Sequence, residues 1–300
     1  MSAERPRIGI DLGGTKVEGI VLDGTGRILE RLRRPTPEGD YEGTLDTICD
    51  LVRELESNHG EIPVGVGTPG AVSPATGRIK NANSTCLNDR PIREDLECRL
   101  SRRIRVANDA NCFALSEAVD GSGAGSSVVF GAILGTGVGG GVVVDRKPLA
   151  GINAISGEWG HNPLPGPTDG ERPGPACYCG RHGCIESWLS GPAMSADHAR
   201  ATGDSLTAKE LADSGTDAAR ATLARYAQRL ARALATVINV LDPDCIVLGG
   251  GLSKIEALYE SVPQLWGEWI FSDRVDTRLL PPRHGDAGGA RGAAWLWPDA

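Results

Sequence analysis

Apolar residues occur along this chain in two patterns that alternate from end to end. Short apolar runs bounded by glycine or proline are typical of buried strands, and we expect strands at 8–11, 17–22, 64–68, 104–107 and 245–248. Apolar residues at helical spacing predict helices at 41–58, 92–100, 112–119, near 253 and, most clearly, at 217–241, which Pro243 closes. Alternating strands and helices predict an α/β fold.

One pattern of strand, glycine turn and strand occurs twice. When residues 9–23 are laid over 131–145, glycine, leucine, valine and aspartate residues coincide. A duplicated unit predicts two related lobes that face each other, each lending a glycine turn to one cleft. Coincidence is the alternative interpretation, because the chain contains 41 glycines.

Composition narrows the class of protein. With 300 residues, 40% of them hydrophobic, 23% charged and a net charge of −8, the chain is typical of an acidic globular protein, and a nucleic-acid partner is not expected. The eight cysteines do not form a disulfide framework, which favours a reducing cytoplasm. We expect no signal peptide and no membrane partner, since glycines divide the apolar stretch at 128–144 into two strands.

Residues 157–186 contain one histidine and three cysteines in a segment rich in glycine and proline. The candidate ligands are His161, Cys177, Cys179 and Cys184. One imidazole and three thiolates complete a tetrahedral zinc site without an open position, so the sequence predicts a structural Zn²⁺ that orders the loop at 162–176. His182 is an alternative fourth ligand on spacing alone, and free thiols or a disulfide are alternative states of the cysteines. Glu158 and Glu186 bracket the cluster and are candidates for binding sugar hydroxyls.

Three glycine turns are candidates for binding a polyphosphate. They are Gly13-Gly14, the turn at 135–141, and Gly249-Gly250-Gly251. Glycine lets backbone N–H groups approach phosphate oxygens closely. Lys16 can add positive charge, Thr15 and Thr136 can donate hydroxyls, and Asp11 can hold water bound to Mg²⁺. Neither the P-loop nor the Rossmann pattern follows the first strand.

Transfer of a phosphoryl group to a hydroxyl requires a base, and Asp109 is the best candidate. It follows a predicted strand at the start of a predicted helix, and its carboxylate would accept the proton of the attacking hydroxyl. An ordinary helix N-cap is the alternative role for this residue. The candidate hydroxyl-binding residues are Asn83, Asn108, Glu158, His161 and Glu186.

Together these motifs resemble the ROK family (repressors, open reading frames and sugar kinases). The segments that carry the resemblance are 11–16 (DLGGTK), 108–111 (NDAN), 135–141 (GTGVGGG), 157–161 (GEWGH) and 177–186 (CYCGRHGCIE). The resemblance implies an actin-like, hexokinase-type ATPase fold with two α/β lobes, the sugar and ATP binding in the cleft between them. It implies a small lobe at 1–108 plus about 285–300 and a large lobe at 109–284, with the zinc-ordered loop at 157–186 in the large lobe.

The resemblance also implies a role for each candidate residue. Asp109 would be the catalytic base, and the hydroxyl-binding residues named above would contact the sugar. His161 would bind zinc through one ring nitrogen and meet the sugar with the other. The nucleotide segments would include Gly13, Gly14, Thr15, Thr136, Gly137 and Gly249 to Gly251.

Within the family, the stretches at 80–85, 160–165 and 292–298 resemble the bacterial fructokinase (mannofructokinase) branch. We therefore expect a cytoplasmic, homodimeric kinase that phosphorylates fructose at the 6-hydroxyl, with mannose or glucose as secondary substrates. N-acetylglucosamine kinase or glucokinase is the alternative, because 109–118 and 284–294 resemble N-acetylglucosamine kinases. A sugar-responsive regulator without turnover is the alternative of another class. The repressor members carry a helix-turn-helix domain ahead of the first glycine turn, which here begins at Gly13.

Overall fold

The computed structural model describes residues 5–298, which form two compact units. The first unit comprises residues through Gly125, Gly141–Ser156, and residues from His284 onward. The second comprises Ser126–Gly140 and Gly157–Arg283. Within residues 5–298, no helix has both the length and the apolar character needed to cross a membrane.

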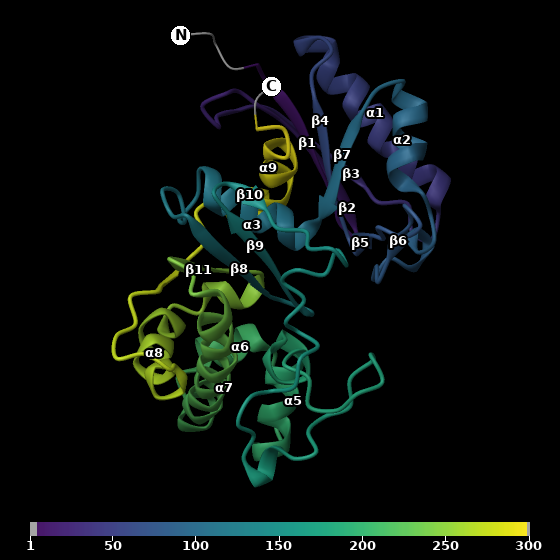
Figure 1. The fold of residues 1–300 in the computed structure, drawn as a ribbon. Helices are drawn as coiled ribbons and strands as arrows, with labels where there is room; N and C mark the ends of the chain where they lie inside the picture. Colours follow the sequence, from purple (N-terminus) through teal and green to yellow (C-terminus); the bar gives the residue numbers. More distant parts are fainter. Residues whose placement is uncertain (1–4, 299–300) are drawn as a thin grey trace. The chain divides into compact units, whose positions relative to one another are not determined.

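The first unit contains strands and helices from both ends of the chain (Figure 1). Its strands are β1 (Arg7–Leu12), β2 (Lys16–Leu22), β3 (Ile28–Pro35), β4 (Val64–Thr68), β5 (Ala71–Val72), β6 (Ile79–Lys80), β7 (Ile104–Asn108) and β10 (Lys147–Pro148). Its helices are α1 (Tyr41–His59), α2 (Ile92–Leu100), α3 (Asp109–Val119) and α9 (Gly288–Trp295), with short 3-10 helices η1 (Thr85–Leu87) and η5 (Gly285–Ala287).

The second unit contains residues 157–186, called here the metal-ligand segment because they include the candidate metal ligands. It also contains most of the helices that follow this segment. Its strands are β8 (Val128–Leu134), β11 (Cys245–Gly249) and β12 (Arg278–Leu280), and β9 (Val138–Val144) begins in it and ends in the first unit. Its helices are α4 (Glu186–Leu189), α5 (Gly191–Thr202), α6 (Ala208–Ser214), α7 (Asp217–Leu241) and α8 (Ala257–Trp266), with η2 (Asp169–Glu171), η3 (Gly251–Lys254) and η4 (Gly267–Trp269).

The two main sheets have the same topology. The strand order is β3-β2-β1-β4-β7 in one and β10-β9-β8-β11-β12 in the other. In the first sheet β1 pairs antiparallel with β2 and parallel with β4, and in the second β8 and β12 both pair parallel with β11. The matching order agrees with a duplicated strand–turn–strand unit at the start of each sheet.

Side-chain alternation in β1 explains how the first sheet is covered on both faces. Ile8 and Ile10 are buried in a core shared with α1 and α2. Gly9 lies on the other face, where an added Cβ would come within 1.9 Å of the Ala290 carbonyl oxygen. Because glycine allows this close approach, α9 packs directly on the strands (Figure 1).

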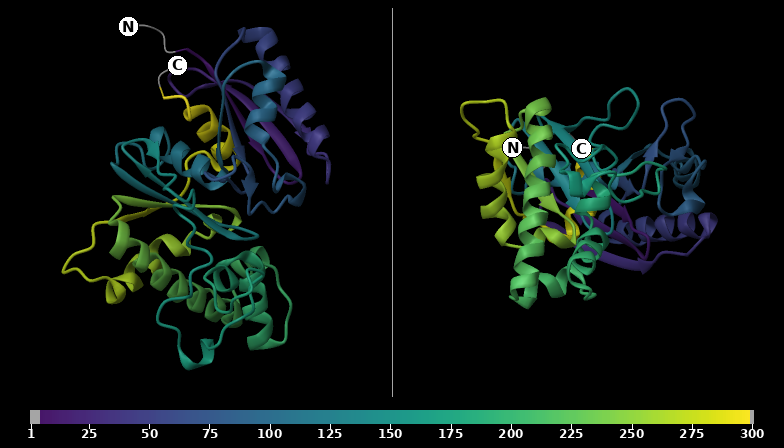
Figure 2. Two further views of the ribbon diagram at one scale, coloured as in Figure 1. Left: turned by 45° about the vertical axis from the view of Figure 1, so that its right-hand side comes forward. Right: turned by 90° about the horizontal axis from the view of Figure 1, so that it is seen from below.

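In the second unit, α7 and α8 lie side by side (Figure 2). The buried stripe of α7 includes Leu230, Leu234 and Ile238, as the apolar pattern predicts. Val262 and Trp266 are the corresponding buried residues of α8. The strands β8 and β11 are almost wholly buried, which explains their continuous apolar sequence.

The unit boundaries differ from those expected from sequence, because α3 belongs to the first unit. A Cβ on Gly292 would lie 1.6 Å from the carbonyl oxygen of Cys112, so α3 and α9 are in very close contact. The C-terminal helix therefore packs against α3 as well as against the first sheet.

Candidate active site

Asp109 and Asn108 lie where β7 passes directly into α3. Asn108 is the helix N-cap, and its Oδ1 accepts a hydrogen bond from the Ala110 N–H at 2.9 Å. Its Nδ2 donates to the carbonyl oxygen of Gly70 at 2.9 Å, which fixes the amide. Asp109 is the first helical residue, and it is exposed. Asn108 is therefore the N-cap, and the exposed Asp109 carboxylate, whose Oδ1 also accepts from the Ala110 N–H at 2.8 Å, is accessible to a substrate.

Asp11 lies at the end of β1, on the strand that pairs with β4, which in turn pairs with β7. Burial raises the pKa of Asp11 to about 7, and the neighbouring carboxylates Asp109 and Glu18 add to this shift, while Lys16 opposes it. Because the neighbours of Asp11 are also carboxylates, a bound cation would stabilise its ionised form. The donor set therefore fits a hydrated Mg²⁺ next to Asp11.

The first glycine turn connects β1 and β2 in a tight hairpin. The Gly13 N–H donates to the Lys16 carbonyl oxygen at 3.0 Å. Gly14, Thr15 and Lys16 are exposed, so their backbone N–H groups and the ammonium group are accessible to an anion. Asn83 is also an exposed residue of the first unit, in the segment between β6 and η1.

The other two glycine turns meet within the second unit. Gly250 has a φ of +78°, and a Cβ there would come within 2.3 Å of the Leu134 carbonyl oxygen. The Gly135 N–H donates to the Gly137 carbonyl oxygen at 2.9 Å, and Gly191 donates to the Gly135 carbonyl oxygen at 2.7 Å. Glycine is therefore required at position 250 for the contact between the two turns, whereas a Cβ on Gly135 would meet no atom within 4 Å. Thr136, which is exposed, lies at the tip of its turn.

Glu186 links the middle glycine turn to the metal-ligand segment. Its Oε2 accepts a hydrogen bond from the Val138 N–H at 2.8 Å, and its own N–H donates to the Gly160 carbonyl oxygen at 2.8 Å. A Cβ on Gly137 would lie only 2.7 Å from this Oε2. A side chain at position 137 would therefore displace the Glu186 carboxylate from the Val138 N–H.

The GEWGH segment is held against β9 by its tryptophan and its second glycine. The Trp159 indole N–H donates to the Gly139 carbonyl oxygen at 2.7 Å, and its ring packs edge-on against Phe130. Gly160 lies so close to β9 that a Cβ would be 2.1 Å from the Val138 carbonyl oxygen. Glu158, between these anchors, is exposed.

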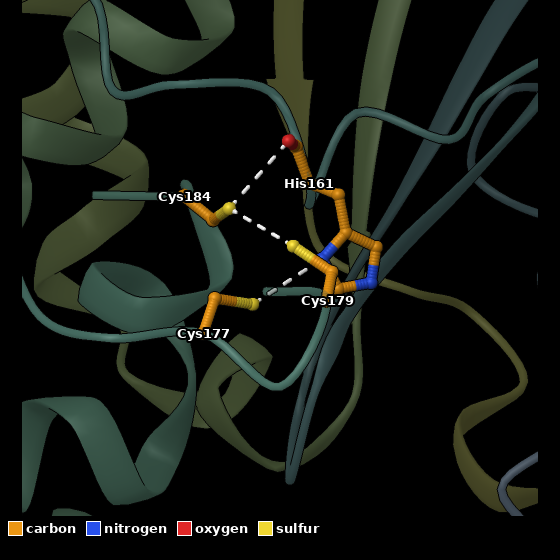
Figure 3. A group of neighbouring side chains, drawn as sticks. All are labelled: His161, Cys177, Cys179 and Cys184. Carbon is orange, nitrogen blue, oxygen red and sulfur yellow. Dashed lines mark hydrogen bonds between the residues drawn. The ribbon is translucent and has the colours of Figure 1, made fainter. Parts of the chain in front are cut away.

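His161 and the three cysteines converge on one point (Figure 3). Their ligand atoms all lie within 4.8 Å of one another. Cys179 Sγ is 3.6 Å from Cys184 Sγ, and Cys177 Sγ is 3.5 Å from His161 Nδ1. Two thiolates bound to one zinc in tetrahedral geometry are separated by about 3.8 Å, so the observed spacing fits a metal ion. His182 is not part of this group among the described residues.

The second ring nitrogen of His161 has a protein partner. Its Nε2 lies 2.9 Å from the Tyr178 hydroxyl oxygen, and the two rings are in edge-to-face contact. The side chain of Tyr178 is 78% exposed. A sugar hydroxyl that contacts Nε2 would therefore replace this tyrosine as its partner.

The loop between His161 and Cys177 has an anchor that sequence reasoning missed. Glu171 forms ion pairs with Arg229 and Arg232 of α7, and all three side chains are largely buried. Arg232 also donates to the Gly166 carbonyl oxygen at 2.5 Å. Hydrogen bonds from Arg229 and Arg232 and from the Thr168 N–H lower the pKa of Glu171 to about 2, against the effect of burial. The signal in the sequence was the helical spacing of Arg225, Arg229 and Arg232.

The residues predicted from sequence thus group by unit. In the first unit Asp11 lies near the end of β1, and Asn108 and Asp109 lie where β7 ends; both strands pair in parallel with β4 between them. In the second, Glu186 joins the 135–137 turn to the segment that carries His161. Their cooperation on one substrate stays a prediction.

Comparison with known proteins identifies the family. The model of the ROK family matches residues 7–300, nearly the whole chain. The chain belongs to the ROK family.

The relatives of this ROK protein include named sugar kinases. N-acetyl-D-glucosamine kinases of Shigella flexneri and Escherichia coli (strain K12 / DH10B) are 40% identical over 307 residues, covering 96% of this chain and 98% of theirs. The ROK hexokinase of Thermus thermophilus has a TM-score of 0.85 at 31% identity, with 97% of each chain covered. A ROK glucokinase from Streptomyces griseus, solved with glucose and AMPPNP, has a TM-score of 0.79 at 28% identity and covers 98% of this chain and 100% of its own. Sequence and fold are those of an ATP-dependent sugar kinase of this family.

Proposed function

We propose that this protein transfers the γ-phosphoryl group of ATP to the 6-hydroxyl of N-acetylglucosamine. The observation that carries the proposal is the 40% identity to N-acetylglucosamine kinases over 96% of the chain. Fructose, which short local resemblances favoured, has no support from these relatives. N-acetylglucosamine, the alternative that the sequence also indicates, is therefore the substrate proposed.

In the proposed mechanism Asp109 accepts the proton of the sugar hydroxyl as the new O–P bond forms. Its exposure at the start of α3 leaves it accessible to the sugar. Asn108, fixed by Gly70 and by its capping bond, would orient the same hydroxyl region. Asn83, Glu158, His161 and Glu186 would hold the remaining hydroxyl groups.

The phosphates would be bound largely by backbone N–H groups at the three glycine turns. Gly13, Gly14, Thr15 and Lys16 would act from the first unit, and Thr136, Gly137 and Gly249 to Gly251 from the second. Mg²⁺ would neutralise charge on the phosphates, and Asp11 would hold its water ligands.

We further propose that His161, Cys177, Cys179 and Cys184 hold a structural Zn²⁺. The spacing of their ligand atoms supports this proposal. A site with four protein ligands has no open coordination position. The metal would therefore fix the segment that carries Glu158 and Glu186 and would take no part in phosphoryl transfer.

A coupled ADP-release assay with MgATP tests the function. N-acetylglucosamine, glucose, mannose, fructose and N-acetylmannosamine are compared by kcat/KM. We expect N-acetylglucosamine to exceed every other sugar at least tenfold. A higher kcat/KM for fructose would restore the fructokinase interpretation, and sugar binding without ADP release would favour a regulator.

A further inference from the structure

A basic cavity lies beside β7, the edge strand of the first sheet. It has a volume of about 910 Å³, and all of its lining residues belong to the first unit. Its positively charged lining residues are Arg93, Arg103, Arg105, Arg146 and Lys147. Glu97 is the acidic lining residue, and its Oε1 already accepts a hydrogen bond from the Ile104 N–H at 3.0 Å.

The charge of this cavity is opposite to that of the chain, which carries −8. Like charges held around one hollow repel each other, so they do not stabilise the fold by themselves. Charged side chains on an edge strand often prevent pairing with another sheet, and Arg105 on β7 and Arg103 just before it fit that role. Arg146 and Lys147 lie at the β9–β10 hairpin, at the edge of the other main sheet, so protection of the edges does not explain why both pairs line one cavity. A bound anionic ligand would explain why both pairs of basic side chains line the same cavity.

Arg105 is held in place before any ligand binds. Its guanidinium group stacks over the Trp297 ring at 4.4 Å and donates a hydrogen bond to the Leu296 carbonyl oxygen. Fixing the planar group in advance reduces the entropy lost on binding, and the guanidinium fork matches phosphate oxygens. This geometry favours a phosphate group over a diffuse negative charge.

The inner wall of the cavity adds a polar group of a different kind. Asn111 lines the cavity, and its buried Oδ1 has no hydrogen-bond partner among the described residues. A buried unpaired acceptor is costly, and a phosphate, which lacks a donor when fully ionised, does not satisfy it. A sugar hydroxyl does. Trp297, Pro298 and Ala71 supply apolar lining for the ring of such a sugar.

We propose that this cavity is a binding site for a sugar phosphate. The phosphate lies among Arg103, Arg105, Arg146 and Lys147, and a sugar hydroxyl donates to Asn111 Oδ1. Asn108 also lines the cavity and precedes Asp109 directly. The ligand therefore binds next to the candidate catalytic base without occupying either of the glycine turns in the second unit.

Isothermal titration calorimetry with glucosamine 6-phosphate tests this site. The titrations are done at low ionic strength, with a non-hydrolysable ATP analogue present at saturation. The test variant is Arg103→Gln/Arg146→Gln. The control variant, Arg53→Gln/Arg220→Gln, removes the same charge from the exposed faces of α1 and α7. We expect affinity at least tenfold weaker in the test variant and within twofold of the wild-type value in the control.

A second comparison separates a sugar phosphate from an inorganic polyphosphate, which has the same charge chemistry. Asn111→Ala should weaken binding of glucosamine 6-phosphate and leave binding of inorganic tripolyphosphate unchanged. Binding of tripolyphosphate alone overturns the assignment to a sugar phosphate. Absence of binding, or equal affinity in the wild type and both double variants, overturns the site. None of these outcomes depends on which hexose is the substrate.

Discussion

Asp109 and Asn108 are adjacent in sequence but differ in what they do for the fold. The Asn108 side chain caps α3 by accepting a hydrogen bond from a backbone N–H of its first turn, whereas Asp109 presents an exposed carboxylate from that turn. A catalytic carboxylate placed beside a separate capping residue can be changed without removing the cap.

Asp109→Asn should reduce kcat by about 10²–10⁴-fold, the usual contribution of a general base. The amide has nearly the same shape but cannot accept the hydroxyl proton. Hexose affinity measured by calorimetry and thermal stability should remain close to those of the wild type. Turnover near the wild-type rate would show that another group accepts the proton.

Asp11 provides a second prediction, on stability. Its pKa is raised from 3.8 to about 7 in the folded protein, so the folded state keeps a proton that the unfolded state releases. Stability is therefore lost as pH rises from about 3.8 through 7, and the loss is complete above that range. In the absence of Mg²⁺ and nucleotide, Asp11→Asn should have a higher Tm than the wild type at pH 8.

The same comparison at pH 5 should show a much smaller difference in Tm, because Asp11 is then mostly protonated. Asp145→Asn is the control, since Asp145 is exposed in a turn at a φ of +47°, which asparagine tolerates. An Asp11→Asn protein that is no more stable than the wild type at pH 8 would contradict the raised pKa.

At the scale of elements, two separate sets of interactions hold the loop between His161 and Cys177. The cysteine–histidine cluster brings the two ends of the loop together, and the ion pairs of Glu171 attach its middle to α7. The sequence predicts zinc as one way to order this loop. The ion pairs are an additional constraint that does not depend on the metal.

Cys179→Ser should reduce bound zinc from about one ion per chain to near zero and should weaken hexose binding. The loss follows because one of four ligands is removed from a closed site. Cys98→Ser is the matched control, an exposed cysteine of α2 outside the cluster. Metal analysis of purified wild-type protein without zinc would refute the proposed metal site.

Glu171→Gln should destabilise the second unit by about 3 kcal/mol, because it leaves buried Arg232 without its counter-charge. Arg229, by contrast, keeps its ion pair with Asp197. Limited proteolysis should then cut the 162–176 loop faster. The lowered pKa of Glu171 means that its contribution is present above about pH 4.5 and is lost as pH falls towards 2. Asp169→Asn, an exposed neighbour in η2, is the control; equal proteolysis of both variants would contradict the anchor.

At the scale of the whole molecule, the two main sheets share one strand order, as a duplicated unit would predict. Each sheet begins with a strand–glycine turn–strand unit and continues with two parallel strands. The glycine turns therefore recur at equivalent places in the two sheets. Their glycines are required by contacts made in the folded chain, as at Gly137 and Gly250.

We also expect a homodimer, as the family resemblance implies. The side chains of Phe271 and Val240 are almost fully exposed. The Phe271 backbone N–H donates a hydrogen bond to Asn239 Oδ1 at 2.9 Å, and Asn239 is the residue before Val240. Apolar side chains presented together in this way are typical of an interface. Sedimentation should give twice the chain mass of 31.4 kDa, with Phe271→Ser shifting the protein towards monomer. Ile152→Ser, at an exposed apolar residue of the first unit, should leave the mass unchanged; a monomeric wild type would refute the expectation.

Local pattern was sufficient for much of the fold. The strand at 64–68 and the helices at 92–100 and 217–241 were predicted with the bounds that the structure has, because periodicity and end signals lie within a few residues. β3 was missed, since its alternating charged residues are stabilised by partners such as Glu18 on β2. The start of α3 was placed three residues too late for a similar reason: its first turn carries Asp109 and Asn111, and its cap is Asn108.

The sequence by itself determined the family motifs, the candidate base, the glycine turns and the candidate metal ligands, because each is encoded in residue types at short spacing. Only the tertiary structure decided that Asn108 is the cap, that Asp11 has a raised pKa, that Glu171 anchors the loop, and that five positively charged side chains line one cavity. These properties depend on burial and on charges contributed by segments far apart in the chain, and both arise only when the chain has folded.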